Sequence, residues 1–210
     1  MCYNTGMSLF LKIFKAVVDL FTTGHTSVTT VITETGYNAE EKNMQIERDY
    51  KLTDHITLFD MTHTDGVGMQ LKNRNISAYL EGMLHATACR MEQVLVLTGK
   101  GIHIHSAYRC PELNGEIPGA VSNSQHVKGE ACDFDVPGQT PEETHKILHK
   151  AMKDGKFWCG QLILEIRGSV KWVHVSQPDP WRDVLKCGQV LLSPKSGVYE
   201  LIEKVAKPVI

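Results

Sequence analysis

The sequence lacks the features that would assign it to several unusual classes of protein. None of its 210 residues belongs to an apolar run of 18, so we expect no transmembrane helix. Its 22 basic and 24 acidic side chains nearly cancel, which argues against a broad nucleic-acid-binding surface. It contains no internal repeat and no low-complexity tract. The remaining composition is typical of one globular domain with some additional chain.

The sequence also lacks a disulfide framework. Its six cysteines lie far apart and form no CxxC pair. A domain of this length can bury a core without disulfide bonds. We therefore expect free thiols, most of them buried.

The first 47 residues are expected to be an N-terminal extension. Residues 7–21 form an apolar segment in which Lys12, Lys15 and Asp19 make one polar stripe, a pattern typical of an amphipathic helix. Three interpretations stay open: a helix packed on the domain, a helix lying on a membrane surface, and a signal or export segment. Residues 22–45 indicate a linker with one short strand.

Residues 48–187 are expected to form the main domain. A long helix should begin at a cap, Asn75, and continue to about Leu97. Strands are expected at residues 102–106 and 131–136. The chain between them, from 111 to 124, is rich in turn residues and indicates a loop, and residues 188–210 indicate a tail that is helical over 197–206.

A second helix has clear end signals. Thr140 is a good N-cap, Pro141 occupies the first helical position, and Glu143 completes a capping box. Gly155 should end this helix. Together these elements predict an α+β fold, with a small, mainly antiparallel sheet flanked by helices.

A hairpin is predicted where two β-leaning runs flank Gly168-Ser169, because a two-residue Gly-X loop is typical of a type II′ turn. In this register Arg167 pairs with Val170. Glu165 then lies opposite Trp172, diagonal to His174 on the same face.

Three short segments carry the chemistry. The sequence from Ser124 to Asp133 offers an imidazole at His126 and a carboxylate at Asp133, both good zinc ligands. His174 shares a strand face with Trp172 and Ser176, so its imidazole could complete a site with Glu165 nearby as general base. Arg109 could hold a substrate carboxylate in a bidentate fork.

Other residues allow alternative metal sites. Asp135 lies on the same strand face as Asp133 and could replace it as ligand. His103 and His105 are two apart on one strand and could reach the site, although a structural role is favoured. Two further histidines, in the sequence HKILH at 145–149, lack the glutamate of an HExxH metal site.

The motifs SxYRxxxxN, SxHxxGxAxD and WVHVS together resemble the zinc D-alanyl-D-alanine peptidase family, which shares its fold with the hedgehog signalling domain. The resemblance spans residues 48–187. It implies one zinc ion bound by His126, Asp133 and His174. It further implies two catalytic residues, Arg109 and Glu165. The substrate contacts that we assign from the resemblance are Ser106, Tyr108, Arg109, Ser124 and Trp172. The chain departs from the family at Pro118, where glycine is usual, and at Cys132 beside the aspartate.

The sequence thus predicts a zinc peptidase that hydrolyses peptidoglycan stem peptides or crosslinks, as a carboxypeptidase or a D,D-endopeptidase. Peptidoglycan is the expected partner, and we expect a monomer that binds no nucleic acid and acts at the cell wall, in the periplasm or outside the cell. A phage lysis enzyme made in the host cytoplasm fits this description. Two alternatives are a catalytically silent, hedgehog-like zinc domain that binds the wall or a partner, and a membrane-associated protein whose function lies in residues 7–21.

Overall fold

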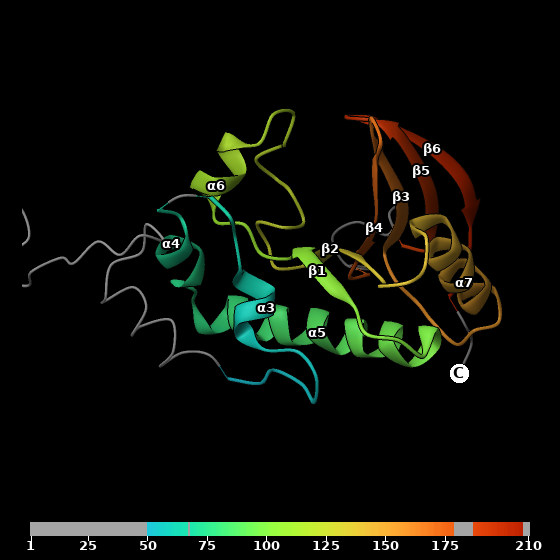
Figure 1. Cartoon of the computed structure of the whole chain (residues 1–210), viewed down its shortest axis with the longest axis horizontal. Helices are drawn as coiled ribbons and strands as arrows, with labels where there is room; N and C mark the ends of the chain where they lie inside the picture. The colour runs from blue at the N-terminus through green and yellow to red at the C-terminus, as the bar shows by residue number, and fades with distance from the viewer. Residues whose placement is uncertain (1–49, 67, 179–186, 208–210) are drawn as a thin grey trace, which may run out of the picture. The chain divides into compact units, whose positions relative to one another are not determined.

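A computed structural model describes residues 50–66, 68–178 and 187–207 of the chain (Figure 1). The described residues all belong to one compact unit. The predicted amphipathic helix at 7–21 and its linker lie outside the described residues. Within the part that is described, no helix is long and apolar enough to cross a membrane.

Six strands form one sheet in the order β1-β2-β4-β3-β5-β6. Only β3 and β5 run parallel, and every other neighbouring pair is antiparallel. The predicted α+β fold with a mainly antiparallel sheet is therefore confirmed. The strands span His103–Ser106 (β1), Ala131–Asp135 (β2), Gln161–Arg167 (β3), Val170–Ser176 (β4), Gln189–Lys195 (β5) and Val198–Lys204 (β6).

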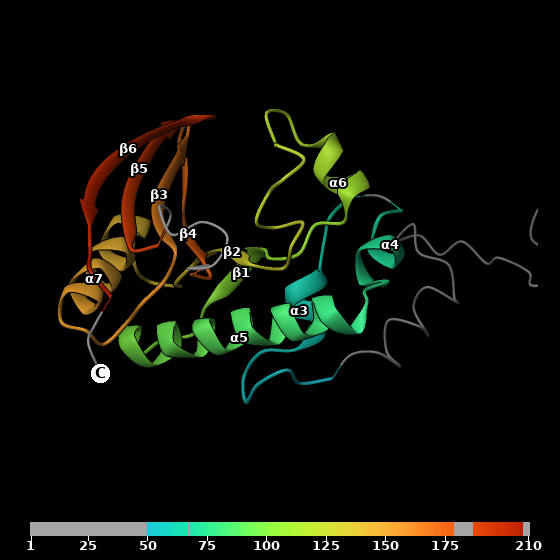
Figure 2. The ribbon, with the colours of Figure 1, turned by 180° about the vertical axis from the view of Figure 1, so that it is seen from behind.

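The helices flank this sheet. They span Leu58–Thr62 (α3), Gln70–Arg74 (α4), Ala78–Thr98 (α5), Pro111–Glu116 (α6) and Pro141–Lys153 (α7). Helix α7 packs on β3 and β4 and also contacts α5 (Figure 2). The predicted capping box of α7 is present, because the side chains of Thr140 and Glu143 each bond the other residue's backbone N–H.

The hydrophobic core lies where α5, α7 and the sheet meet. Leu84 and Met91 of α5, Phe134 of β2, Leu148 of α7 and Val173 of β4 are all fully buried. Among the described residues, Cys89, Cys110, Cys132 and Cys159 are free thiols, and all of these but Cys89 are buried, as the sequence predicted. A core of this kind fixes β2 and β4, the two neighbouring interior strands that carry the candidate site.

Two sequence predictions about helices are wrong. Asn75 does not cap the long helix: it ends α4, and Ser77 caps α5 through a bond from the backbone N–H of Leu80 to its side chain. Three residues form the turn between α4 and α5, so the N-cap of α5 lies two residues after the predicted position. The expected loop at 111–124 begins instead with α6, whose first residue is Pro111, a favoured first helical position.

The C-terminal tail also differs from its prediction. Residues 197–206 were expected to be helical, but Val198–Lys204 forms the edge strand β6. It pairs with β5, which pairs in turn with β3. The turn between β5 and β6 contains Gly197 at a φ of 73°, a conformation that favours glycine. Pairing with an existing sheet outweighs the weak local helix preference of this segment.

Candidate metal centre and catalytic site

Three predicted ligands meet at the centre of the sheet. Asp133 of β2 and His174 of β4 are direct cross-strand partners, and His126 approaches from the loop before β2. The Nδ1 atom of His174 lies 2.7 Å from Oδ1 of Asp133, and Nε2 of His126 lies 3.3 Å from Oδ2. One ligand atom from each residue lies within 4.8 Å of the others. The fold therefore assembles two imidazoles and one carboxylate at one point.

The backbone fixes the orientation of His126. Its Nδ1 lies 2.7 Å from the carbonyl oxygen of Ala107, so Nδ1–H donates there and the lone pair of Nε2 faces Asp133. The turn beyond it depends on Gly129, whose φ is 69°. A Cβ at this glycine would lie 2.9 Å from Cδ1 of Leu80. Both observations show that the turn between His126 and β2 requires a glycine at this position.

The charges of the cluster favour a bound cation. Burial raises the pKa of Asp133, but His126 and His174 more than compensate and hold that pKa well below its usual range. Burial lowers the pKa of His126, so its imidazole tends to be neutral. An ionised carboxylate thus lies against two imidazoles in a buried place, where a bound cation would compensate its negative charge.

The chemistry of the donor set supports the same conclusion. Two imidazoles and one carboxylate are also the donor set of many catalytic zinc sites. The residues present therefore fit a zinc ion.

Glu165 lies beside this cluster, as the predicted hairpin register requires. Arg167 pairs with Val170, Glu165 with Trp172, and Ile163 with His174, so the predicted register is confirmed. The loop residue Gly168 has a φ of 62°, which fits a type II′ turn.

The surroundings of Glu165 affect its protonation. Its side chain is buried, and burial raises the pKa of its carboxyl group. The charges of His174 and Arg167 lower the same pKa. Nη2 of Arg167 lies 2.5 Å from Oε2 of Glu165. A carboxylate with opposing effects of this kind is suited to accept and return a proton.

Arg109 also lies close to the cluster. Its Nη1 is 3.9 Å from Oδ2 of Asp133, and its Nη2 donates to Oγ of Ser124 at 3.5 Å. Burial lowers the pKa of the guanidinium, while Asp133 and Glu165 raise it. Its Nε is buried without a partner in the part of the chain that the structure describes. The arginine is thus held near the site, and its Nε–H group is a hydrogen-bond donor that a substrate could use.

The other predicted substrate contacts occupy varied places. Ser124 lies at the site, where its Oγ also accepts from the backbone N–H of His126 at 3.3 Å. Ser106, the last residue of β1, pairs with Asp133. Tyr108 belongs to the hydrophobic core, which supports a packing role for its ring. The guanidinium of Arg167 lies over the ring of Trp172, with Cζ 5.5 Å from the ring centroid. Their contacts with substrate stay predictions.

Sequence reasoning missed two residues near the site. Asn73 is fully buried and bonds the carbonyl oxygens of Thr62 and Tyr108 and the N–H of Cys110, which holds the segment carrying Arg109. A buried asparagine in a short helix gives no sequence signal. Tyr199 of β6 was missed because its segment was predicted to be helical. Its side chain is half-buried, and the pKa of its phenol is raised first by this burial and then by the negative charge of Glu165.

The alternative ligands lie apart from the centre. Asp135, His103 and His105 contact one another rather than His126 or His174. The buried thiol of Cys132, beside Asp133, has a pKa raised well above its usual value by burial, so it stays protonated.

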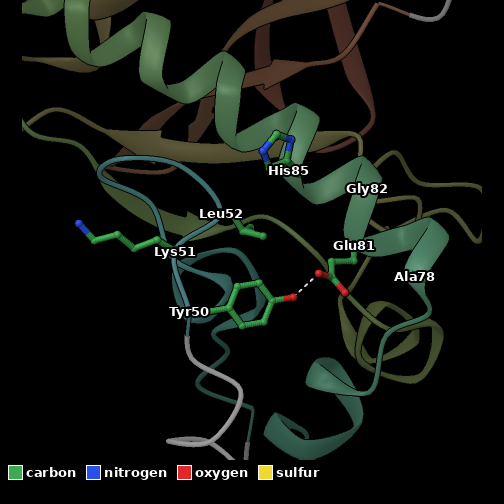
Figure 3. A pocket seen from close by; sticks show the side chains of 7 residues that line it. All are labelled: Tyr50, Lys51, Leu52, Ala78, Glu81, Gly82 and His85. Carbon is green, nitrogen blue, oxygen red and sulfur yellow. Dashed lines mark hydrogen bonds between the residues drawn. The ribbon is translucent and has the colours of Figure 1, made fainter.

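Two other features lie outside the centre. Nε2 of His149 bonds Oε2 of Glu203 at 2.7 Å, which ties α7 to β6. A pocket at the start of α5 contains none of the predicted site residues; Figure 3 shows Tyr50 there, with its hydroxyl bonded to Glu81.

The fold and the donor set are those of a metal-dependent hydrolase, and comparison with known families makes the class more specific. The model of the Peptidase M15 family matches residues 59–176, more than half of the chain. The chain therefore belongs to the Peptidase M15 family, the zinc D-Ala-D-Ala peptidases. The match runs from the second residue of α3 to the end of β4 and includes His126, Asp133 and His174. No curated protein matches the chain.

Proposed function

We propose that this protein is a zinc peptidase that hydrolyses the stem peptides of peptidoglycan or the crosslinks between them. Membership of the Peptidase M15 family supports the reaction class. The observation that carries the proposal is the buried group of His126, Asp133 and His174, with Glu165 and Arg109 beside it. A hydrolase needs these parts: metal ligands, a base and a group that positions the substrate.

Each of the three ligand residues would supply one donor group to the metal. Nε2 of His126, the carboxylate of Asp133 and the imidazole of His174 would bind the ion. When bound, zinc supplies a polarised carbonyl and a water of lowered pKa. The carbonyl of Ala107 keeps the lone pair of His126 aimed inward, through the bond at Nδ1.

Glu165 is the proposed general base. Its carboxylate would take a proton from the attacking water and pass it to the nitrogen of the leaving amine. Burial raises the pKa of its carboxyl group, which makes the carboxylate a stronger base in the first transfer than an ordinary glutamate. Arg167 holds the carboxylate in place at 2.5 Å.

Arg109 is the proposed substrate clamp. Its guanidinium would pair with a free terminal carboxylate in a bidentate fork. Ser124 orients the arginine by accepting from Nη2. A carboxypeptidase substrate presents such a carboxylate, and so we favour peptides with a free C-terminus. The proposed substrate places the site of action at the cell wall.

The first experiment is mass spectrometry of purified peptidoglycan digested by the protein, with and without a zinc chelator. We expect a mass change that the chelator abolishes. Loss of terminal D-alanine alone would identify a carboxypeptidase, and conversion of dimers to monomers would identify a crosslink endopeptidase. An unchanged digest, from protein shown to hold its zinc, would contradict the proposed function. Wall binding without cleavage would then support the silent binding domain.

A further inference from the structure

A second group of potential ligands lies on the edge strand β1 and its neighbour β2. Nδ1 of His103 is 3.7 Å from Oδ1 of Asp135, and Nε2 of His105 is 3.2 Å from Oδ2. The two imidazole centroids are 4.7 Å apart in an edge-on arrangement. One ligand atom from each residue lies within 4.8 Å of the others. Each imidazole therefore lies next to a different oxygen of the Asp135 carboxylate.

The backbone brings these side chains together through an irregularity in the sheet. His103 pairs with Asp135 and Ile104 with Phe134, but Ser106 rather than His105 pairs with Asp133. The extra residue in β1 is a bulge, and His105 occupies it. A bulge changes the direction of a side chain. His103 lies directly opposite Asp135, and Nε2 of His105, at the bulge, reaches the same carboxylate.

This group shares no residue with the centre formed by His126, Asp133 and His174. It also differs in its surroundings. The side chains of His103, His105 and Asp135 are 67%, 39% and 37% exposed, whereas those of the first centre are nearly buried. A metal ion could reach the second group directly from solvent.

The donor types indicate which ion would bind. Imidazole nitrogen suits zinc, copper, nickel and cobalt, whereas calcium and magnesium prefer oxygen donors. Two imidazoles and one carboxylate supply three positions of a tetrahedral zinc site, and water can complete it. An exposed group of acids alone would have no such selectivity.

We propose that His103, His105 and Asp135 form a second metal site, which binds a divalent transition-metal ion such as zinc. The ion would link β1 to β2 at the edge of the sheet. This site is separate from the proposed catalytic centre, and neither depends on the other.

The test counts zinc in the full-length protein. The chain is stripped with a chelator, equilibrated with zinc chloride, and passed through a desalting column, and the metal is measured by plasma mass spectrometry. We expect two zinc ions per chain. In the double variant His103→Ala/His105→Ala, and independently in Asp135→Asn, the count should fall by one.

A matched control removes two exposed histidines elsewhere, as His55→Ala/His85→Ala, and should keep both ions. All these side chains are at least partly exposed, so the variants should fold, which circular dichroism checks. A count that is the same in wild type and in the double variant would overturn the second site, whether that count is one or two. A fall from one ion to none would support the second site and contradict zinc binding at the first.

Discussion

Arg167 and Glu165 form a close ion pair on one face of β3, with Nη2 and Oε2 2.5 Å apart. The arginine is held rigidly, because its Nη1 also donates to the carbonyl of Ile166 at 2.8 Å and to Oγ of Ser193 at 3.2 Å. Its guanidinium lies over the ring of Trp172. The candidate base is therefore held in a fixed position beside the metal centre, with a positive charge that opposes the effect of burial on its pKa.

This pair predicts a shift in the pH dependence of activity. Burial raises the pKa of Glu165, and Arg167 lowers it, so the variant Arg167→Gln should raise it further. A general base works only when it is deprotonated, and so the acid limb of the kcat/KM profile should move to higher pH. The measurement is kcat/KM against pH on a soluble stem peptide.

The matched control is Lys171→Gln. It removes the same charge from the next strand, but Lys171 pairs with Ile166 and contacts Glu142, away from Glu165. The acid limb of Lys171→Gln should stay where the wild type has it. The variant Arg167→Lys keeps the positive charge, so its acid limb should also lie close to that of the wild type. Equal profiles for wild type and Arg167→Gln would show that the arginine does not set the pKa of the base.

Removal of the base predicts a loss of turnover without a loss of metal. Glu165→Gln keeps the shape of the side chain but cannot accept a proton, so kcat/KM should fall about 100- to 10,000-fold. Zinc content and the circular dichroism spectrum should be unchanged, because the carboxylate is not a predicted ligand. The surface variant Glu142→Gln serves as control. Full activity in Glu165→Gln would remove this residue from the mechanism.

The parts of the molecule that could be predicted are those in which local chemistry decides the structure. The loop Gly168-Ser169 sets the register of β3 and β4, and this register alone brings Glu165 beside His174. The capping box at Thr140 sets the start of α7 in the same way. Each depends on residues close together in the sequence, so the pattern contains enough information.

The parts that could not be predicted depend on distant contacts. The tail becomes β6 because β5 offers it an edge, and so the position of Tyr199 could not be predicted. Asn73 bonds segments that lie 11 and 35 residues away. No local pattern marks a buried amide with distant partners. The meeting of His103, His105 and Asp135 depends on a bulge, which the alternation of the strand does not predict.

The clamp predicts a difference between substrates. Arg109→Lys keeps the charge but loses the planar fork, and a lost charged hydrogen bond contributes about 1.5 to 3 kcal/mol. For peptides with a free terminal carboxylate, kcat/KM should therefore fall roughly 10- to 100-fold. Amidated versions of the same peptides should be cleaved equally by both proteins. A similar loss on both kinds of peptide would mean that Arg109 acts through Asp133 or Ser124 and not on the substrate.

The last prediction concerns the support of Arg109. Asn73 makes three bonds to the backbone of two segments, at 2.7 to 3.0 Å, and is fully buried. Asn73→Ala should leave two carbonyl oxygens and one N–H with fewer partners in the core and lower the free energy of unfolding by about 2 to 4 kcal/mol. Urea unfolding in the presence of a chelator measures this, so that metal binding does not contribute.

The control for this variant is Asn75→Ala, two residues further along the chain. Asn75 is exposed and ends α4 at a φ of −80°, which alanine adopts without strain, so its unfolding midpoint should stay close to wild type. Because Asn73 fixes the carbonyl of Tyr108 and the N–H of Cys110, its loss should also misplace the arginine between them. Asn73→Ala should therefore weaken cleavage of carboxylate-ended peptides more than of amidated ones, at temperatures where the variant is still folded. Equal stability of the two alanine variants would show that the bonds of Asn73 do not hold this segment.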